Sequence, residues 1–116
     1  MMDFETMRAY LGGKRGAREE YPFDATTLVF KVGGKMFALV AEDGEPPRVT
    51  LKCDPPEAEA LRAAFPAIRP GYHMNRVHWN TVTLDGSVPD DVVREMMDDS
   101  YALVVRSLTK ARHEAL

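Results

Sequence analysis

The sequence predicts a single α+β domain, residues 1–116, in which helices pack on one face of an antiparallel sheet in the order α-βββ-α-ββ-α. Segments with helical spacing and recognisable start signals alternate with short groups of β-branched and aromatic residues. Tight turns join the predicted strands, which favours antiparallel pairing. A chain of 116 residues that is 45% hydrophobic is long enough for one core, and it contains no repeat or low-complexity linker.

The first helix is predicted to follow Asp3, a suitable N-cap residue. Apolar residues recur at helical spacing from Phe4 to Leu11, and Gly12-Gly13 can end the helix in a left-handed C-cap. Residues 14–20 have mixed charge and no periodicity, so they are predicted to form a solvated loop.

Three strands are predicted next, as a meander. Residues 27–32 and 35–40 are rich in β-branched and aromatic residues, and they flank Gly33-Gly34, which permits the positive φ angles of a primed hairpin turn. Residues 41–47 form an acidic turn. Residues 48–52 then alternate between polar and apolar side chains, as a half-exposed antiparallel strand does.

The second helix is predicted over 55–65. Asp54 is placed to be its N-cap, Pro55 occupies its first position, and Glu57 completes a pattern similar to a capping box. Pro66 ends it.

A second pair of strands is predicted over 68–74 and 77–84, with a turn near Asn75-Arg76. The third helix is then predicted to begin after Ser87 as N-cap, with an early proline at Pro89 and acidic residues in its first turn. Its broad apolar face makes it the longest helix, packed across the sheet.

The charge pattern predicts a polarised surface. A net charge of −3 and a pI near 5.6 argue against a protein that coats nucleic acid without specificity, because such binding depends on Lys and Arg. However, segments 26–41, 46–53 and 69–84 contain no acid and carry +2 each, whereas 85–99 carries −5. The strand regions are therefore mildly positive and the helix surfaces acidic.

The N-terminal residues and the single cysteine indicate in which cellular compartment the protein is expected. The first residues lack the basic flank and apolar stretch of a signal peptide, and no apolar run is long enough to span a membrane. A soluble cytoplasmic protein without a membrane partner is expected. Cys53 is the single cysteine, so it cannot form an internal disulfide, and we expect a buried, inert thiol.

Residues 70–81 hold the highest density of functional groups: the only Trp, two of the three His, both Asn and a Tyr. His73 and His78 are five positions apart across a turn, with no acid or Cys nearby to complete a ligand set, so a metal site is not predicted. No arrangement of nucleophile, base and orienting group is recognisable either. We therefore assign no catalytic residue and no cofactor.

Two functions remain open from the residues themselves. The preferred one is a non-enzymatic DNA-binding or regulatory module in which two hairpins project basic and amide side chains. Its contact residues would be Lys31, Lys35, His73, Asn75, Arg76 and Asn80. The alternative is a protein-interaction or small-ligand-binding domain with a cleft beside the sheet. That cleft would be lined by Tyr72, His73, His78, Trp79 and Asn80.

Trp79 allows two interpretations within these hypotheses. Its indole could stack on an exposed base. The interpretation that we favour is a buried anchor whose ring holds the second hairpin to the body of the protein.

Several motifs spread over nearly the whole chain carry a family resemblance. They are Tyr21-Pro22-Phe23, Val29-Phe30-Lys31-Val32-Gly33-Gly34-Lys35-Met36-Phe37-Ala38, Leu51-Lys52-Cys53-Asp54-Pro55, Arg69-Pro70-Gly71-Tyr72-His73-Met74-Asn75, His78-Trp79-Asn80-Thr81-Val82, Leu84-Asp85-Gly86-Ser87-Val88-Pro89-Asp90 and Asp99-Ser100-Tyr101-Ala102-Leu103-Val104. With this combination the chain resembles the MmcQ/YjbR family. The resemblance implies a compact fold similar to bacterial frataxin (CyaY-like), described as a double wing, with DNA binding proposed from that shape.

The chain departs from the family pattern at the second wing. A Lys commonly follows the Asn there, and another basic residue often comes next, whereas this chain has Arg76 and then Val77. Of the two phosphate contacts that the resemblance would imply, this chain keeps one and lacks the other. Frataxins collect iron on an acidic first helix, but here that helix offers only Asp3 and Glu5, so the resemblance does not imply an iron function.

Overall fold

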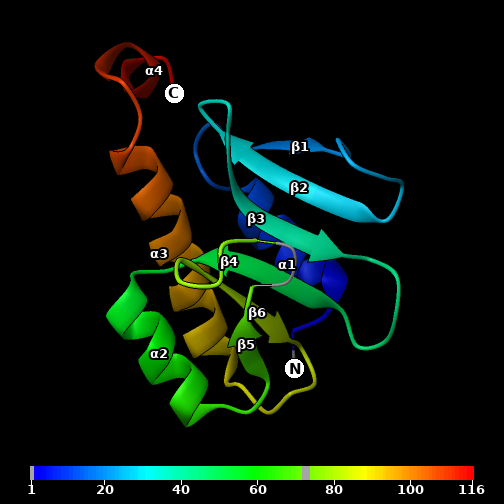
Figure 1. Cartoon of the computed structure of the whole chain (residues 1–116). Helices are drawn as coiled ribbons and strands as arrows, with labels where there is room; N and C mark the ends of the chain where they lie inside the picture. Colours follow the sequence, from blue (N-terminus) through cyan, green and yellow to red (C-terminus); the bar gives the residue numbers. More distant parts are fainter. Residues whose placement is uncertain (1, 72–73) are drawn as a thin grey trace.

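The computed structural model describes residues 2–71 and 74–116 and confirms the α+β prediction. Six strands form one antiparallel sheet in the order β1-β2-β3-β4-β6-β5 (Figure 1). The strands are β1 (Arg18–Glu20), β2 (Thr27–Val32), β3 (Lys35–Ala41), β4 (Arg48–Lys52), β5 (Ile68–Pro70) and β6 (Trp79–Thr83). The helices are α1 (Phe4–Gly12), α2 (Pro55–Ala64), α3 (Asp90–Arg106) and α4 (Lys110–Glu114).

The hairpin of β2 and β3 forms as predicted. Gly33 and Gly34 have φ angles of 58° and 83°, the left-handed region that a primed turn requires. The pairing register shifts between Phe30 and Lys31, so that Phe37 becomes an extra residue of β3. This first wing is thus a twisted hairpin with a bulge near its tip.

Two short elements differ from the sequence prediction. Residues 18–20, predicted as loop, form β1 and pair with β2, with Arg18 opposite Lys31. All three residues are exposed and charged, so no apolar alternation could reveal a strand that depends on main-chain hydrogen bonds. Helix α4 was not predicted for the same reason, since its five residues have no buried face.

The second pair of strands is shorter than predicted. Among the described residues of these ranges, 68–70 and 79–83 are strands, compared with the predicted 68–74 and 77–84; residues 72 and 73 lie outside the described residues. The intervening described residues fold into a turn whose amide groups bond to Asn75 instead of to a facing strand. The second wing is therefore mostly a structured loop.

The helix ends follow the predicted positions with different capping. Asp3 caps α1 by accepting a hydrogen bond from the Thr6 amide at 2.8 Å. Gly13 follows α1 with φ −78°, so the predicted left-handed cap does not form. Asp54 makes no side-chain capping bond to α2. Pro89, not Ser87, occupies the cap position of α3, because the Ser87 hydroxyl bonds to Asp85 instead.

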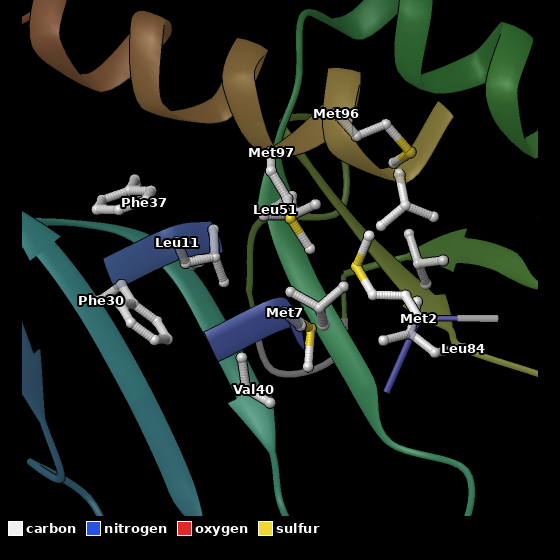
Figure 2. Close-up of a cluster of buried hydrophobic side chains, with 14 of the residues drawn as sticks. Met2, Met7, Leu11, Phe30, Phe37, Val40, Leu51, Leu84, Met96 and Met97 are labelled. Carbon is white, nitrogen blue, oxygen red and sulfur yellow. The ribbon is translucent and has the colours of Figure 1, made fainter. Parts of the chain in front are cut away.

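The core lies between the sheet and the helices. In Figure 1, α1 and α3 lie behind the sheet, and α4 extends beyond the tip of the first wing. Figure 2 shows side chains from α1, α3 and the strands meeting in one apolar cluster. The labelled members are Met2, Met7, Leu11, Phe30, Phe37, Val40, Leu51, Leu84, Met96 and Met97. Along each strand the alternate side chains then face away from these helices.

The Ser100 hydroxyl joins α3 to the sheet at the bulge. Its side chain is fully buried, and its oxygen donates to the Phe37 carbonyl at 2.5 Å and accepts from the Lys52 amide at 2.8 Å. Phe37 has no partner in the strand registers, so the hydroxyl satisfies a carbonyl that the bulge removes from the ladder. Within residues 2–71 and 74–116, no helix is long and apolar enough to cross a membrane.

Replacing Ser100 should therefore cost more than a typical surface substitution. In Ser100→Ala the Phe37 carbonyl and the Lys52 amide stay buried without their partner, so we expect the free energy of unfolding to fall by about 1–3 kcal/mol. Urea unfolding followed by Trp79 fluorescence measures this. Ser87→Ala, at an exposed serine, is the control and should change stability by less than about 0.5 kcal/mol. Equal effects of the two substitutions would contradict the bridging role.

Candidate functional site

The face of the sheet without α1, α2 and α3 carries a row of side chains on neighbouring strands. Leu39 of β3 faces Thr50 of β4, and Thr50 faces Thr81 of β6. The Thr50 and Thr81 hydroxyls are 2.8 Å apart and hydrogen-bonded, and each residue is 8% exposed. A second row places Thr27, Ala41 and Arg48 side by side.

A cleft of about 510 Å³ lies over these two rows. Its floor comes from the outward-facing positions of the strands, and its walls come from three loops. The lining residues are Phe23, Asp24, Thr26, Thr27, Leu39, Ala41, Asp43, Arg48, Thr50, Met74 and Thr81. The cleft therefore combines apolar side chains, hydroxyls and charges of both signs.

The loop before β2 supplies an ordered wall. Asp24 accepts hydrogen bonds from the Thr26 amide at 2.9 Å and the Thr27 amide at 2.7 Å. These donors hold the pKa of the Asp24 carboxyl below its usual value, so the group is a fixed anion at neutral pH. Next to it, the Phe23 ring is 63% exposed, which leaves a large apolar surface in water at the mouth of the cleft.

The second wing is held by polar contacts that occupy several predicted contact groups. The Asn75 side-chain oxygen accepts from the amides of Val77 at 2.9 Å and His78 at 3.2 Å. Asn80 is fully buried, and its side-chain nitrogen donates to the Ala58 carbonyl of α2. Asn75 and Asn80 therefore shape the wing: the Asn75 oxygen binds amides of the turn, and Asn80 is enclosed, so its predicted contact with a ligand would require it to become exposed.

Arg62 of α2 anchors this wing. Its guanidinium donates to the Asn80 side-chain oxygen at 2.6 Å, to the Trp79 carbonyl at 3.3 Å and to the Arg76 carbonyl. Sequence reasoning missed this role, because an Arg near the end of an amphipathic helix is ordinarily a solvated residue.

Trp79 is buried, at 8% exposure, as the favoured interpretation expected. Trp79 pairs with Lys52 in the β4–β6 ladder. Its neighbour Asn80 points toward α2, and successive side chains of a strand point to opposite faces, so the Trp79 side chain faces away from α2. Gly71 lies against it: a Cβ there would stand 2.6 Å from the Trp79 Cβ. The Gly71 amide also donates to the Trp79 carbonyl at 2.7 Å. The main chain and Cβ of Trp79 are therefore packed directly against Gly71 at the base of the second wing.

The basic residues predicted to contact DNA have different environments. Lys31 forms an ion pair with Glu20 at 2.8 Å, and Lys35 donates to the Ser107 carbonyl and hydroxyl at 3.2 and 3.1 Å. Arg76 is exposed at the turn of the second wing. His73 lies outside the described residues.

The sheet register brings the two wing tips to one end of the molecule. Lys52, the last residue of β4, pairs with Trp79, the first residue of β6, and lies beside the start of β3. Gly33-Gly34 and the 74–78 turn are therefore at the same end of the sheet (Figure 1).

The structure describes three of the five residues predicted to line the alternative cleft. Tyr72 and His73 lie outside the described residues, His78 is exposed, and Trp79 and Asn80 are buried. None of these last three lines the 510 Å³ cleft; of the described residues of the second wing, Met74 lines it.

Comparison with known proteins shows the family of this chain. The YjbR family model matches residues 12–103. The chain belongs to the YjbR family. The YjbR protein of Escherichia coli K12 is 36% identical to it over 115 residues, covering 99% of this chain and 98% of that protein. Bacillus subtilis YyaQ is 33% identical over 117 residues, covering 89% and 98%. Both relatives are described as uncharacterised.

Solved structures of similar proteins agree with the YjbR fold. A crystal structure of a Deinococcus radiodurans protein with a DUF419 domain is 42% identical and superposes with a TM-score of 0.92, covering 99% of this chain and 88% of that one. A Pseudomonas syringae crystal structure, 26% identical, has a TM-score of 0.76 over 88% of this chain and 98% of that one. The expected likeness to frataxin stays a prediction.

The anchoring role of Arg62 can be measured directly. Arg62→Met keeps an unbranched side chain of similar bulk but removes every donor, so the buried Asn80 oxygen loses its charged partner. We expect a loss of about 1–3 kcal/mol of stability in urea and faster amide exchange at Val77 and Trp79. Arg69→Met is the control, because Arg69 is exposed and its side chain donates to the nearby Pro66 carbonyl, away from the Asn80 side chain. Unchanged exchange in the second wing would refute the anchoring role.

Proposed function

We propose that this YjbR-family protein binds a small organic molecule in the cleft on the helix-free face of its sheet. The supporting observation is the cleft itself, whose volume of about 510 Å³ falls within the range of roughly 300–1,000 Å³ typical of small-molecule sites. The proposal keeps the small-ligand function inferred from the sequence, and it moves the site from the His78 region to the outward-facing side chains of β2, β3, β4 and β6.

The lining suggests the chemistry of the ligand. Leu39 and Met74 offer apolar surface, and Phe23 presents an exposed ring on which a flat apolar group could pack. Arg48 and Asp43 stand in the same lining and give the site polar partners of opposite charge. The ligand class that fits is a small aromatic molecule with at least one ionised or hydrogen-bonding substituent.

Nucleic-acid binding by the two wings is a second candidate, and one observation favours it. The register puts both tips at the same end of the sheet, where Lys35 and Arg76 are exposed. A basic residue on each tip could then contact the phosphates of one duplex or single strand. Asn80 is fully buried and cannot reach a phosphate in this conformation, whereas Lys31, Lys35 and Asn75 would each exchange an internal partner for one.

The ligand proposal can be tested by NMR titration with 2-naphthoate and, separately, with the cation 2-naphthylmethylammonium. We expect saturable shifts of the amides of Leu39, Thr50 and Thr81 with at least one probe, and the probe that binds more tightly reports whether Arg48 or the carboxylates dominate. Leu39→Lys should weaken binding about tenfold or more, because it puts a long charged chain on the cleft floor.

Leu103→Lys is the matched control for that titration. Leu103 is half-buried on α3, away from the cleft, so this substitution adds the same charge without touching the lining. Equal affinities of the two variants, or shifts located elsewhere with both probes, would exclude the cleft as the binding site.

The nucleic-acid candidate has a separate test. Binding of labelled duplex and single-stranded DNA should fall with rising salt, and the Lys35→Ala/Arg76→Ala double variant should reduce the slope of log K against log salt by about 2. Arg8→Ala/Arg94→Ala removes the same charge from α1 and α3 and should leave the slope nearly unchanged. Absence of binding even at low salt removes this function.

A further inference from the structure

A second hollow, of about 310 Å³, lies at the edge of the sheet beyond the first wing. It is enclosed by β1, by the turn between β2 and β3 and by the C-terminal residues that follow α3, and it shares no lining residue with the 510 Å³ cleft. Its lining residues are Gly16, Arg18, Glu20, Lys31, Gly33, Gly34, Arg112, Ala115 and Leu116.

The side chains of this hollow are predominantly cationic. Arg18, Lys31 and Arg112 contribute three positive side-chain charges, whereas Glu20 contributes the one side-chain carboxylate of the lining residues and is paired with Lys31 at 2.8 Å. The protein as a whole has a net charge of −3. A cavity whose side chains sum to +2 within an acidic protein concentrates anions locally.

Arg112 is held in place by the first wing. One of its terminal nitrogens donates to the Gly33 carbonyl at 2.7 Å. A Cβ at Gly34 would stand 2.8 Å from that same nitrogen, so the missing side chain is what lets the guanidinium approach. A guanidinium has five N–H donors, and this contact uses one side of the fork.

The segment that carries Arg112 is fixed at several further points. Lys35 donates a hydrogen bond to the Ser107 carbonyl. Leu108 packs against the turn so closely that a Cβ added at Gly33 would stand 2.6 Å from the Leu108 side chain. The Leu116 carbonyl accepts two hydrogen bonds from Arg15, at 3.0 and 2.7 Å. The cations around the hollow are therefore presented by connected elements instead of by a free tail.

We infer that this hollow binds a phosphate group. Arg18, Lys31 and Arg112 are the residues that would hold it, because Arg pairs with phosphate oxygens through two parallel N–H donors and Lys supplies a point charge. The phosphate could belong to a small phosphorylated compound or to the backbone of a nucleic acid; the binding chemistry is the same in both cases.

The test is an NMR titration with inorganic pyrophosphate at constant ionic strength, with sodium chloride as the reference anion. We expect saturable shifts at Arg18, Lys31 and Gly34, with a Kd on the order of 1 mM or lower. Shifts that chloride reproduces, or shifts located elsewhere, would overturn the assignment, and this result does not depend on any variant.

Two variants with opposite expected effects make the test sharper. Arg18→Gln removes a cation and should weaken pyrophosphate binding about five- to tenfold. Glu20→Gln removes the carboxylate that competes for Lys31 and should tighten binding about two- to fivefold. Arg69→Gln, an equal loss of charge on β5, is the control and should change little. Equal effects of Arg18→Gln and Arg69→Gln would refute the site.

A competition arm separates the two sources of phosphate. If duplex DNA displaces pyrophosphate from wild type, and Arg18→Gln weakens the binding of both, the hollow binds the nucleic-acid backbone. If DNA fails to displace pyrophosphate, the site takes a small phosphorylated compound. Failure of pyrophosphate to bind removes the inference and leaves the proposal for the 510 Å³ cleft standing, because no lining residue is common to both.

Discussion

One buried hydroxyl connects the elements on which both candidate sites depend. Ser100 joins α3 to the bulged residue Phe37 of β3 and to Lys52 at the end of β4. The hydroxyl gives hydrogen-bond partners to the Phe37 carbonyl and the Lys52 amide, which have no partner in the irregular ladder. It therefore stabilises the bulge near the tip of the first wing. The apolar core lies between one face of the sheet and the helices, and the cleft lies on the opposite face.

The two wings have the same position at the end of the sheet but different physical construction. The first is a regular hairpin whose turn depends on two glycines with positive φ. The second is a loop held by side chains: Asn75 bonds to its amides, and Arg62 connects it to α2. The two wings should therefore respond differently to substitution. Replacing a side chain that holds the second wing can increase the mobility of its loop without disturbing the strands.

The fold was largely predictable from the sequence, and the candidate sites were not. The Gly33-Gly34 turn and the helix start after Asp3 are local signals, and each formed where expected. Strand β1 and helix α4 were missed because charged residues without a buried face leave no periodic pattern. The cleft was missed because outward-facing threonines on a strand look like an ordinary solvated surface; the walls that enclose them come from loops distant in sequence.

The two edges of the sheet limit how molecules of this protein can associate. Strands β1 and β5 are the outermost, and each has only three residues. All residues of β1 are charged, and β5 ends in Pro70, which has no amide hydrogen to donate. Short, charged and proline-ended edges are the features by which natural sheets resist the addition of foreign strands and subsequent aggregation. The open face can therefore stay accessible to ligands in a sheet that is protected from growth at its sides.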